Sequence, residues 1–227
     1  MRDASIVDIV WGLGFVIVAW VALWAGDADD RSWLIAVLAG VWGLRLAGYL
    51  AWRNLGKGED YRYKAMRRRY GERFGLISLV TVFGLQGVLM WIVSLPLQAA
   101  AGSEIGIVDW LGIALWAVGL FFEIVGDAQL ARFKGDPANH GKVLDQGLWR
   151  YTRHPNYFGD FCVWWGLYLI ALAGGAWWTV IGPAVMSVLL MRYSGVGLLE
   201  KTIGKRRSGY DEYVRTTNAF FPGPPKS

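Results

Sequence analysis

Apolar residues occur in six long runs along this chain, and polar segments separate the runs. The runs cover about 5–25, 32–52, 76–98, 107–130, 157–173 and 176–192. Each approaches the roughly 20 residues that a helix needs to cross a bilayer. We therefore predict an all-α polytopic membrane helix bundle with six transmembrane helices, or seven if the C-terminal tail re-enters the membrane. The ending FFPGPPKS cannot be helical and predicts a cytoplasmic C-terminal cap.

The later runs depend on particular residues. The fourth run carries two acidic residues, Glu123 and Asp127, but its other face is continuously apolar. The fifth and sixth runs are shorter and are joined only by AGGA, which predicts a tight hairpin. Proline is favoured at the first position of a helix, so Pro155 places the start of the fifth span near Asn156. The free N–H groups of that start form a ready anion site.

The composition agrees with a membrane protein and limits its organisation. Of the 227 residues, 55% are hydrophobic, and the mean hydropathy is +0.33. We find no internal repeat and no low-complexity linker, so the chain is expected to form a single integral membrane domain over 1–227. Residues 1–100 contain spans with few polar positions, whereas 107–227 carry most of the dense polar sequence.

The positive charges predict the topology. Segment 53–73 holds eight Lys and Arg residues, 131–155 holds five, 200–227 holds six and Arg2 adds one, while loops 26–31 and 101–109 hold only Arg31. By the positive-inside rule, both termini and the two long basic loops are cytoplasmic. We expect a bacterial inner-membrane protein. Its net charge of +5 indicates contact with anionic headgroups or an anionic ligand, not nucleic acid.

The richest polar cluster is QGLWRYTRHPNYFGD, residues 146–160. Arg150, Arg153 and His154 come just before the predicted helix start, and Asn156 and Asp160 then share one helix face. Cations and helix N–H groups suit phosphates, while an amide and a carboxylate suit hydroxyls or a carboxamide. This mix is typical of a dinucleotide site. The alternative is a basic interfacial loop with aromatic belt residues.

Charged residues inside apolar runs form two further groups. Glu123 and Asp127 lie one turn apart and could accept hydrogen bonds from ribose hydroxyls, or could pair with Arg45 or Arg192 as a structural ion pair. Arg45 also shares a face with Tyr49 and Arg53, at i, i+4 and i+8. Such a buried Arg–Tyr face could polarise a carbonyl. Ion pairing and snorkelling towards the interface are the alternatives.

The remaining candidates lie in the first span and near the C-terminal tail. Asp8 lies in the first span, and the tail region adds Arg192, Glu200, Tyr210 and Tyr213. The chain has two histidines and one cysteine, so we expect no zinc site.

One motif resembles a known family. Asp127 lies late in a span and is followed by Arg132 and Lys134. The sequence then continues with Gly147-Leu148-Trp149, Tyr151 and Asn156-Tyr157-Phe158-Gly159-Asp160. This pattern resembles the steroid 5α-reductase family, and more closely the bacterial proteins of undefined substrate that share its C-terminal domain. LQG at 85–87 and the ending with Tyr210, Tyr213, Phe221 and Pro222 are similar too.

The resemblance implies an oxidoreductase that binds NADPH from the cytoplasmic side. Such an enzyme delivers hydride to the β-carbon of an α,β-unsaturated carbonyl in a lipid-like substrate, such as a steroid, polyprenoid or fatty acyl derivative. The spans in 1–100 then face the substrate and residues 107–227 face the cofactor. The residues predicted to bind the cofactor, from the resemblance and the clusters above, are Arg53, Glu123, Asp127, Arg132, Lys134, Arg150, Arg153, His154, Asn156, Tyr157, Asp160, Arg192, Glu200, Tyr210 and Tyr213.

The catalytic residues rest on a different argument. In that family a Tyr and a Glu or Gln come from the N-terminal half, and neither aligns here. Arg45, Tyr49 and Asp8 are therefore chosen by their depth in the membrane.

Two other functions stay open. Residues 153–159, RHPNYFG, also fit the R-H-P-x-Y-x-G pattern of isoprenylcysteine and phospholipid methyltransferases, which use S-adenosylmethionine. The Glu-Glu pair of those enzymes reads Glu200-Lys201 here, and Asp127, Asp160 and LQG favour the reductase. The third function is a non-enzymatic lipid-binding or transport protein. That function would need a polar path to both faces, which the short outer loops do not favour.

Overall fold

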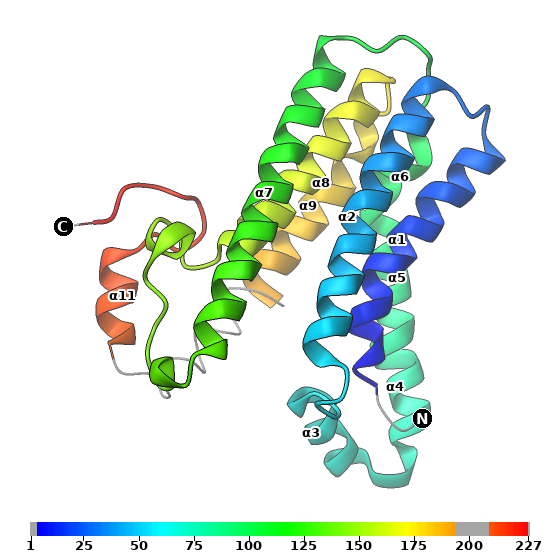
Figure 1. The fold of residues 1–227 in the computed structure, drawn as a ribbon. Coiled ribbons are helices and arrows are strands. Elements are labelled where there is room, and N and C mark those ends of the chain that lie inside the picture. Colours follow the sequence, from blue (N-terminus) through cyan, green and yellow to red (C-terminus); the bar gives the residue numbers. More distant parts are fainter. Residues whose placement is uncertain (1–3, 194–208, 227) are drawn as a thin grey trace. The chain divides into compact units, whose positions relative to one another are not determined.

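The computed structural model describes residues 4–193 and 209–226, and all regular structure in those two ranges is helical (Figure 1). The predicted all-α fold is confirmed for this part of the chain. The chain divides into two compact units. Unit 1 comprises Met1–Gly106 with Ile170–Gly182, and unit 2 comprises Ile107–Leu169 with Pro183–Ser227.

Unit 1 contains two long helices followed by a segmented one. Its elements are α1 (Ile6–Ala25), α2 (Asp30–Asn54), α3 (Tyr61–Tyr70), a 3-10 turn (Gly71–Arg73), α4 (Phe74–Ser78), a π-helical stretch (Leu79–Gly84), α5 (Leu85–Val93), α6 (Leu95–Ala99) and a 3-10 turn (Trp177–Val180).

Unit 2 contains the longest helix of the described residues and a short cap. Its elements are α7 (Ile107–Gly135), 3-10 turns at Pro137–Asn139 and Gly147–Arg150, α8 (Pro155–Ala173), α9 (Ile181–Val188), a π-helical stretch (Leu189–Tyr193) and α11 (Tyr210–Thr216). The last residues of α8 and the first of α9 belong to unit 1.

Four helical stretches are long and apolar enough to cross a membrane: Ile6–Ala25, Asp30–Asn54, Tyr61–Val93 and Ile107–Gly135. They overlap the first four predicted spans, although the third stretch begins at Tyr61 and the third predicted run at 76, and they indicate an integral membrane protein. The fifth and sixth predicted spans are helical as well. However, α8 is not among these four and Trp177–Arg192 is shorter, so the count of six stays a prediction. The seven residues of α11 are too few to cross a bilayer.

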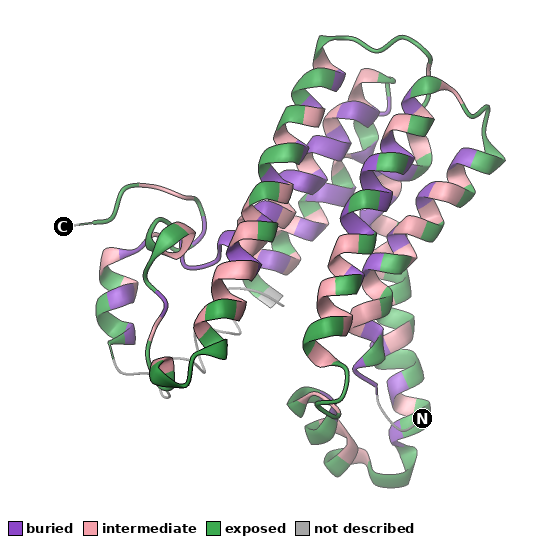
Figure 2. Ribbon diagram, in the orientation of Figure 1, coloured by how far each residue is buried: buried purple, intermediate pink, exposed green. Residues whose placement is uncertain are grey.

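The first helix shows how each span presents two faces. Its buried residues, Val7, Gly12, Phe15, Ala19 and Leu23, recur at helical spacing. Ile6, Val10, Leu13, Ile17 and Val21 form a second stripe and are exposed although they are apolar. Figure 2 shows the same alternation of buried and exposed positions around the other long helices. An apolar exposed stripe of this length suits contact with lipid.

Close packing of α1 on α2 forms the centre of unit 1. A Cβ atom added to Gly43 would lie 2.6 Å from the carbonyl oxygen of Gly12, so the two backbones touch at this level. Next to this contact the rings of Phe15 and Trp42 pack at 5.7 Å, and both side chains are fully buried.

Hydrogen bonds join the two loops that the charge pattern placed on one side of the membrane. Arg31 is buried and donates to the carbonyl oxygens of Ala101, at 2.6 Å, and Glu104. Asp29 caps the start of α2 by accepting from Ser32 N at 2.9 Å, and it also accepts from Gly102 N at 2.6 Å. Loops 26–31 and 100–106 therefore lie at the same end of unit 1, as the topology requires.

Candidate functional site

The contact between α7 and α8 is built on glycines at heptad spacing. Gly112, Gly119 and Gly126 lie seven residues apart on α7, and Gly159 and Gly166 do the same on α8. A Cβ atom added to Gly119 would lie 2.5 Å from the carbonyl oxygen of Gly159. A Cβ atom added to Gly166 would lie 2.6 Å from the carbonyl oxygen of Gly112. Small residues let helix backbones approach this closely. We call this contact the glycine seam. It was not predicted from the sequence, although the seven-residue spacing of the glycines is a signal that could have indicated it.

Two predicted acidic residues lie on the seam. Glu123 and Asp127 follow Gly119 by four and eight residues, so they share its helix face, and both are buried. The added Cβ of Gly159 would lie 2.8 Å from Glu123 Cγ, which places the Glu123 side chain against the backbone of α8. The glycines thus make the room in which these carboxylates are buried.

Asn156 connects the start of α8 to this acidic face. Its Nδ2 donates to Asp127 Oδ1 at 3.2 Å, and its Oδ1 accepts from Tyr157 N at 3.1 Å. Pro155 is the first residue of α8, as predicted from the sequence. Asp160 lies one turn further along α8 and is half-buried. The structure therefore joins two segments, around 127 and 156, that lie 29 residues apart in sequence.

The residues just before α8 hold the C-terminal tail. Arg153 is buried, and its Nη1 donates to the carbonyl oxygens of Val214 and Thr217 at 2.9 and 3.0 Å. Thr152 Oγ1 donates to Phe220 O at 2.7 Å. These bonds dock the tail as a cap against 147–154. Arg153 was predicted as a cofactor ligand, and the structure places this Nη1 on main-chain oxygens.

The tail tyrosines contribute to the same cap. Tyr213 Oη donates to Trp149 O at 2.6 Å, and the rings of Tyr210 and Tyr213 lie 6.2 Å apart, both buried. Trp149 in turn donates from Nε1 to Gly126 O at 3.1 Å, which ties the cap to the seam. The ring of His154 stacks on that of Tyr157 at 5.6 Å.

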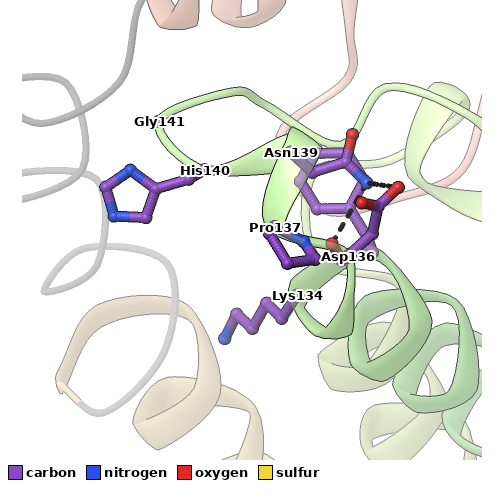
Figure 3. Close-up of a pocket in the computed structure, with 7 residues that line it drawn as sticks. Lys134, Asp136, Pro137, Asn139, His140 and Gly141 are labelled. Carbon is purple, nitrogen blue, oxygen red and sulfur yellow. Dashed lines mark hydrogen bonds between the residues drawn. The ribbon is translucent and has the colours of Figure 1, made fainter.

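The predicted phosphate-binding cations lie outside the buried region. Arg132, Lys134 and Arg150 are all exposed. Beside Lys134, a hollow of about 310 Å³ is lined by the loop that follows α7 (Figure 3). Asp136 stabilises that loop by accepting a hydrogen bond from Ala138 N at 2.9 Å. The residues that line the hollow are Phe133, Lys134, Asp136, Pro137, Asn139, His140 and Gly141.

Two further cofactor candidates are placed differently. Arg192 is exposed in the π-helical stretch Leu189–Tyr193. Glu200 lies outside the described residues.

The catalytic candidates Arg45, Tyr49 and Asp8 all belong to unit 1, and so does Arg53, which was predicted to bind the cofactor. The guanidinium carbons of Arg45 and Arg53 lie 5.7 Å from the ring centroid of Tyr49, so the predicted i, i+4, i+8 face exists with the ring between two cations. Asp8 has other neighbours, which the sequence analysis did not name. Its Oδ2 pairs with Arg62 at 2.9 Å, and its Oδ1 accepts from Tyr63 at 3.2 Å.

Comparison with known proteins identifies the family. The chain belongs to the family described as Protein of unknown function (DUF1295), whose model matches residues 1–217. It is also similar to Uncharacterized protein C594.04c of Schizosaccharomyces pombe, with 25% identity over 94% of this chain and 67% of that protein. No solved structure matches the chain.

Proposed function

We propose that this member of the DUF1295 family is a membrane-embedded, NADPH-dependent reductase. Its substrate would be an α,β-unsaturated carbonyl lipid, such as a steroid, polyprenoid or fatty acyl derivative. The observation that carries the proposal is the hydrogen bond between Asn156 and Asp127 across the glycine seam. It brings together the two parts of the motif that resembles the steroid 5α-reductases. The proposal includes six spans, with both termini in the cytoplasm of a bacterial cell.

The side chains of unit 2 have the chemical groups that could bind each part of NADPH. The amide and carboxylates of Asn156, Asp127 and Asp160 suit ribose hydroxyls and the nicotinamide carboxamide. The exposed cations Arg132, Lys134 and Arg150 suit the phosphates. We assign Arg153 and Tyr213 to a supporting role, because both donate to carbonyl oxygens within the cap. Glu123 stays in the proposed set because it is buried beside Asp127 on the seam.

The chemistry needs a hydride and a proton. Bound NADPH would supply the hydride for the β-carbon of the substrate. The protein's own task is to polarise the carbonyl oxygen and deliver a proton to the α-carbon. We assign that task to unit 1, with Arg45 and Tyr49 at the carbonyl oxygen and Asp8 as the acid that gives its proton to the α-carbon. Tyr63 donates a hydrogen bond to Asp8 and would position that carboxyl group.

The test is cofactor binding by the full-length protein in detergent. Thermal unfolding is followed with NADPH, NADH and S-adenosylmethionine. A ligand at 100 times its Kd stabilises the native state by about 2.7 kcal/mol, which for a chain of this size raises Tm by about 5–10 °C. We expect this shift with NADPH. The variants Asn156→Ala and Asp160→Ala should lose most of it, while Gln98→Ala and Asp27→Ala, the amide and carboxylate controls in unit 1, should keep it. If both site variants bind NADPH like the wild type, the assignment is wrong.

One observation favours a second candidate, a methyltransferase that uses S-adenosylmethionine. Two buried carboxylates, Glu123 and Asp127, suit a ligand with positive charge better than a ligand with several phosphates. A thermal shift with S-adenosylmethionine alone would select this function.

A further inference from the structure

We propose that α3 lies in the headgroup layer and that its outward cations bind anionic phospholipids. This inference concerns unit 1 and does not rest on the proposed reductase activity. The sequence of α3, YRYKAMRRRY, contains five cations and no acidic residue. The structure sorts these cations into two sets with different surroundings.

The first set ties the helix to the rest of unit 1. Arg67 donates to Glu59 with Nε at 3.0 Å and with Nη2 at 2.7 Å, and Glu59 also accepts from Ala4 N at 3.0 Å. The hydrogen bonds from Arg67 hold the pKa of Glu59 below its usual range. Arg62 pairs with Asp8 and Asp60, each at 2.9 Å.

Apolar contacts hold the same face of α3. Tyr63 is buried in a cluster with Ala4, Val7, Phe74 and Val82, and Met66 and Tyr70 pack against it. Residues 63, 66, 67 and 70 share one side of a helix. The helix is therefore anchored on that side both by ion pairs and by apolar packing.

The second set has no carboxylate at hydrogen-bonding distance among the contacts described above. Lys64, Arg68 and Arg69 are exposed on α3, with the guanidinium carbon of Arg69 at 5.5 Å from the ring centroid of Tyr70, and Arg73 is exposed just after the helix. Lys64 and Arg68 are at i and i+4, a spacing at which like charges repel and destabilise a helix in water. Glu72 is the single acidic residue between 61 and 93. An anionic surface would attract both cations and so offset their mutual repulsion.

The neighbouring segments place α3 at the edge of the apolar layer. Trp52 and Leu55, which precede it, are 69% and 70% exposed, and Leu76, which follows it, is 72% exposed. Such exposed apolar side chains are suited to lipid, so α3 lies between two chain segments that enter the hydrocarbon. Gly71, with φ of 55°, ends α3 in a conformation that favours glycine and lets the chain change direction before α4 (Figure 1).

The arrangement of the cations selects a headgroup layer as the partner. They are spread along the exposed surface of α3. A spread of single cations matches a surface that carries many separate phosphates. A free phosphate ion would instead need several donors directed at one point.

The experiment is lipid binding to the full-length protein, purified in detergent and studied by native mass spectrometry. Phosphatidylglycerol and phosphatidylcholine are titrated separately. Each basic residue near an anionic surface contributes a factor of about five. We therefore expect the wild type to prefer phosphatidylglycerol, and the double variant Arg68→Gln/Arg69→Gln to bind it about 30-fold more weakly. Binding of phosphatidylcholine should not change.

Matched variants distinguish the loss of these particular cations from a general loss of positive charge. Arg215→Gln/Lys226→Gln removes two exposed cations from unit 2 and should retain the preference, as should Arg68→Lys/Arg69→Lys, which keeps the charge. Equal weakening in Arg215→Gln/Lys226→Gln would overturn the site. The site would also be overturned if Arg68→Gln/Arg69→Gln bound phosphatidylglycerol as tightly as the wild type and had an unchanged melting temperature. A further titration tests whether the cations bind a lipid headgroup or free phosphate. The melting temperature is measured with inorganic phosphate and with phosphatidylglycerol, and an equal rise with both would overturn the assignment to lipid.

Discussion

The anchor of α3 in unit 1 and the cap of unit 2 use arginine in different ways. In unit 1, Arg62 and Arg67 pair with carboxylates of Asp8, Asp60 and Glu59. In unit 2, Arg153 donates to main-chain oxygens of the tail. Carboxylate pairs depend on pH and salt, whereas bonds to carbonyl oxygens do not titrate. The anchor of α3 therefore depends on charge pairs, whereas the cap of unit 2 depends on hydrogen bonds to backbone carbonyl oxygens.

The units also differ in how their helices pack. In unit 1, α1 and α2 touch backbone to backbone at the level of Gly12 and Gly43. In unit 2, α7 and α8 approach at successive levels with a seven-residue repeat, and the buried carboxylates lie on the same face. Repeated close contact gives a rigid seam, which is what a site with fixed geometry requires.

The largest effect is expected from filling the seam. Gly119→Ala places a methyl group 2.5 Å from Gly159 O and 2.7 Å from Val163 N, and backbone atoms cannot move aside cheaply. We expect a loss of about 3 kcal/mol, seen as a fall in Tm of about 6 °C or more in detergent. Gly48→Ala is the control, because an added Cβ there meets nothing within 4 Å. Equal melting of the two variants would show that the seam is not closely packed.

The next effect concerns turnover and rests on the proposed reductase function. Asp8→Asn should lower the reduction rate of any enone lipid that the wild type accepts by about 100-fold, the usual scale for an acid–base group. The thermal shift with NADPH should stay unchanged, because the cofactor is assigned to unit 2. Arg62→Gln breaks the same ion pair but keeps the carboxylate of Asp8. If both variants lose activity equally, Asp8 acts only through the ion pair.

A smaller effect is expected from releasing the cap. Arg153→Ala leaves the carbonyl oxygens of Val214 and Thr217 without this donor, at a cost of about 1.5–3 kcal/mol. Hydrogen exchange of residues 210–226 should accelerate, while exchange in α1 and α2 stays as in the wild type. Arg215→Ala removes an exposed arginine from the same tail and should leave the exchange unchanged. Unaltered tail protection in Arg153→Ala would mean that other contacts hold the cap.

The smallest effect is the pH dependence of unit 1. The pKa of Glu59 is lowered by hydrogen bonds from Arg67, so its contribution to stability is complete above the ordinary pKa of Glu, about 4.3. It is lost as the pH falls from there through the lower folded pKa. We expect Glu59→Gln to remove about 0.2–1 kcal/mol at pH 7. Melting curves between pH 7 and 3 should converge for the two proteins at the acid end; a constant difference would contradict the ion pair.

Local features of this chain could be predicted because they depend on neighbours in sequence. The runs at 5–25 and 107–130 became α1 and α7, and Pro155 became the first residue of α8. The face of Arg45, Tyr49 and Arg53 also appeared as expected. Helical periodicity and proline geometry act over a few residues, so the sequence contains all that they need.

Pairing between distant segments could not be predicted in the same way. Asp8 was grouped with Arg45 and Tyr49 by depth, yet its contacts are Arg62 and Tyr63, more than 50 residues away. Segment 53–73 alone offers eight cations, so charge matching does not select one of them. The bonds from Arg153 to the carbonyl oxygens of Val214 and Thr217 could not be predicted either, because every residue has such an oxygen.

The order of residues was enough to predict that this protein is helical, where its main helices begin and which residues share a helix face. The contact of Asn156 with Asp127, the docking of the tail on Arg153 and the anchoring of α3 by Arg62 and Arg67 became visible only in the folded chain. The physical reason is the range of the interactions. Helix periodicity is written in adjacent residues, whereas a partner across a seam depends on how closely two backbones approach, and that approach is set jointly by glycines in both helices.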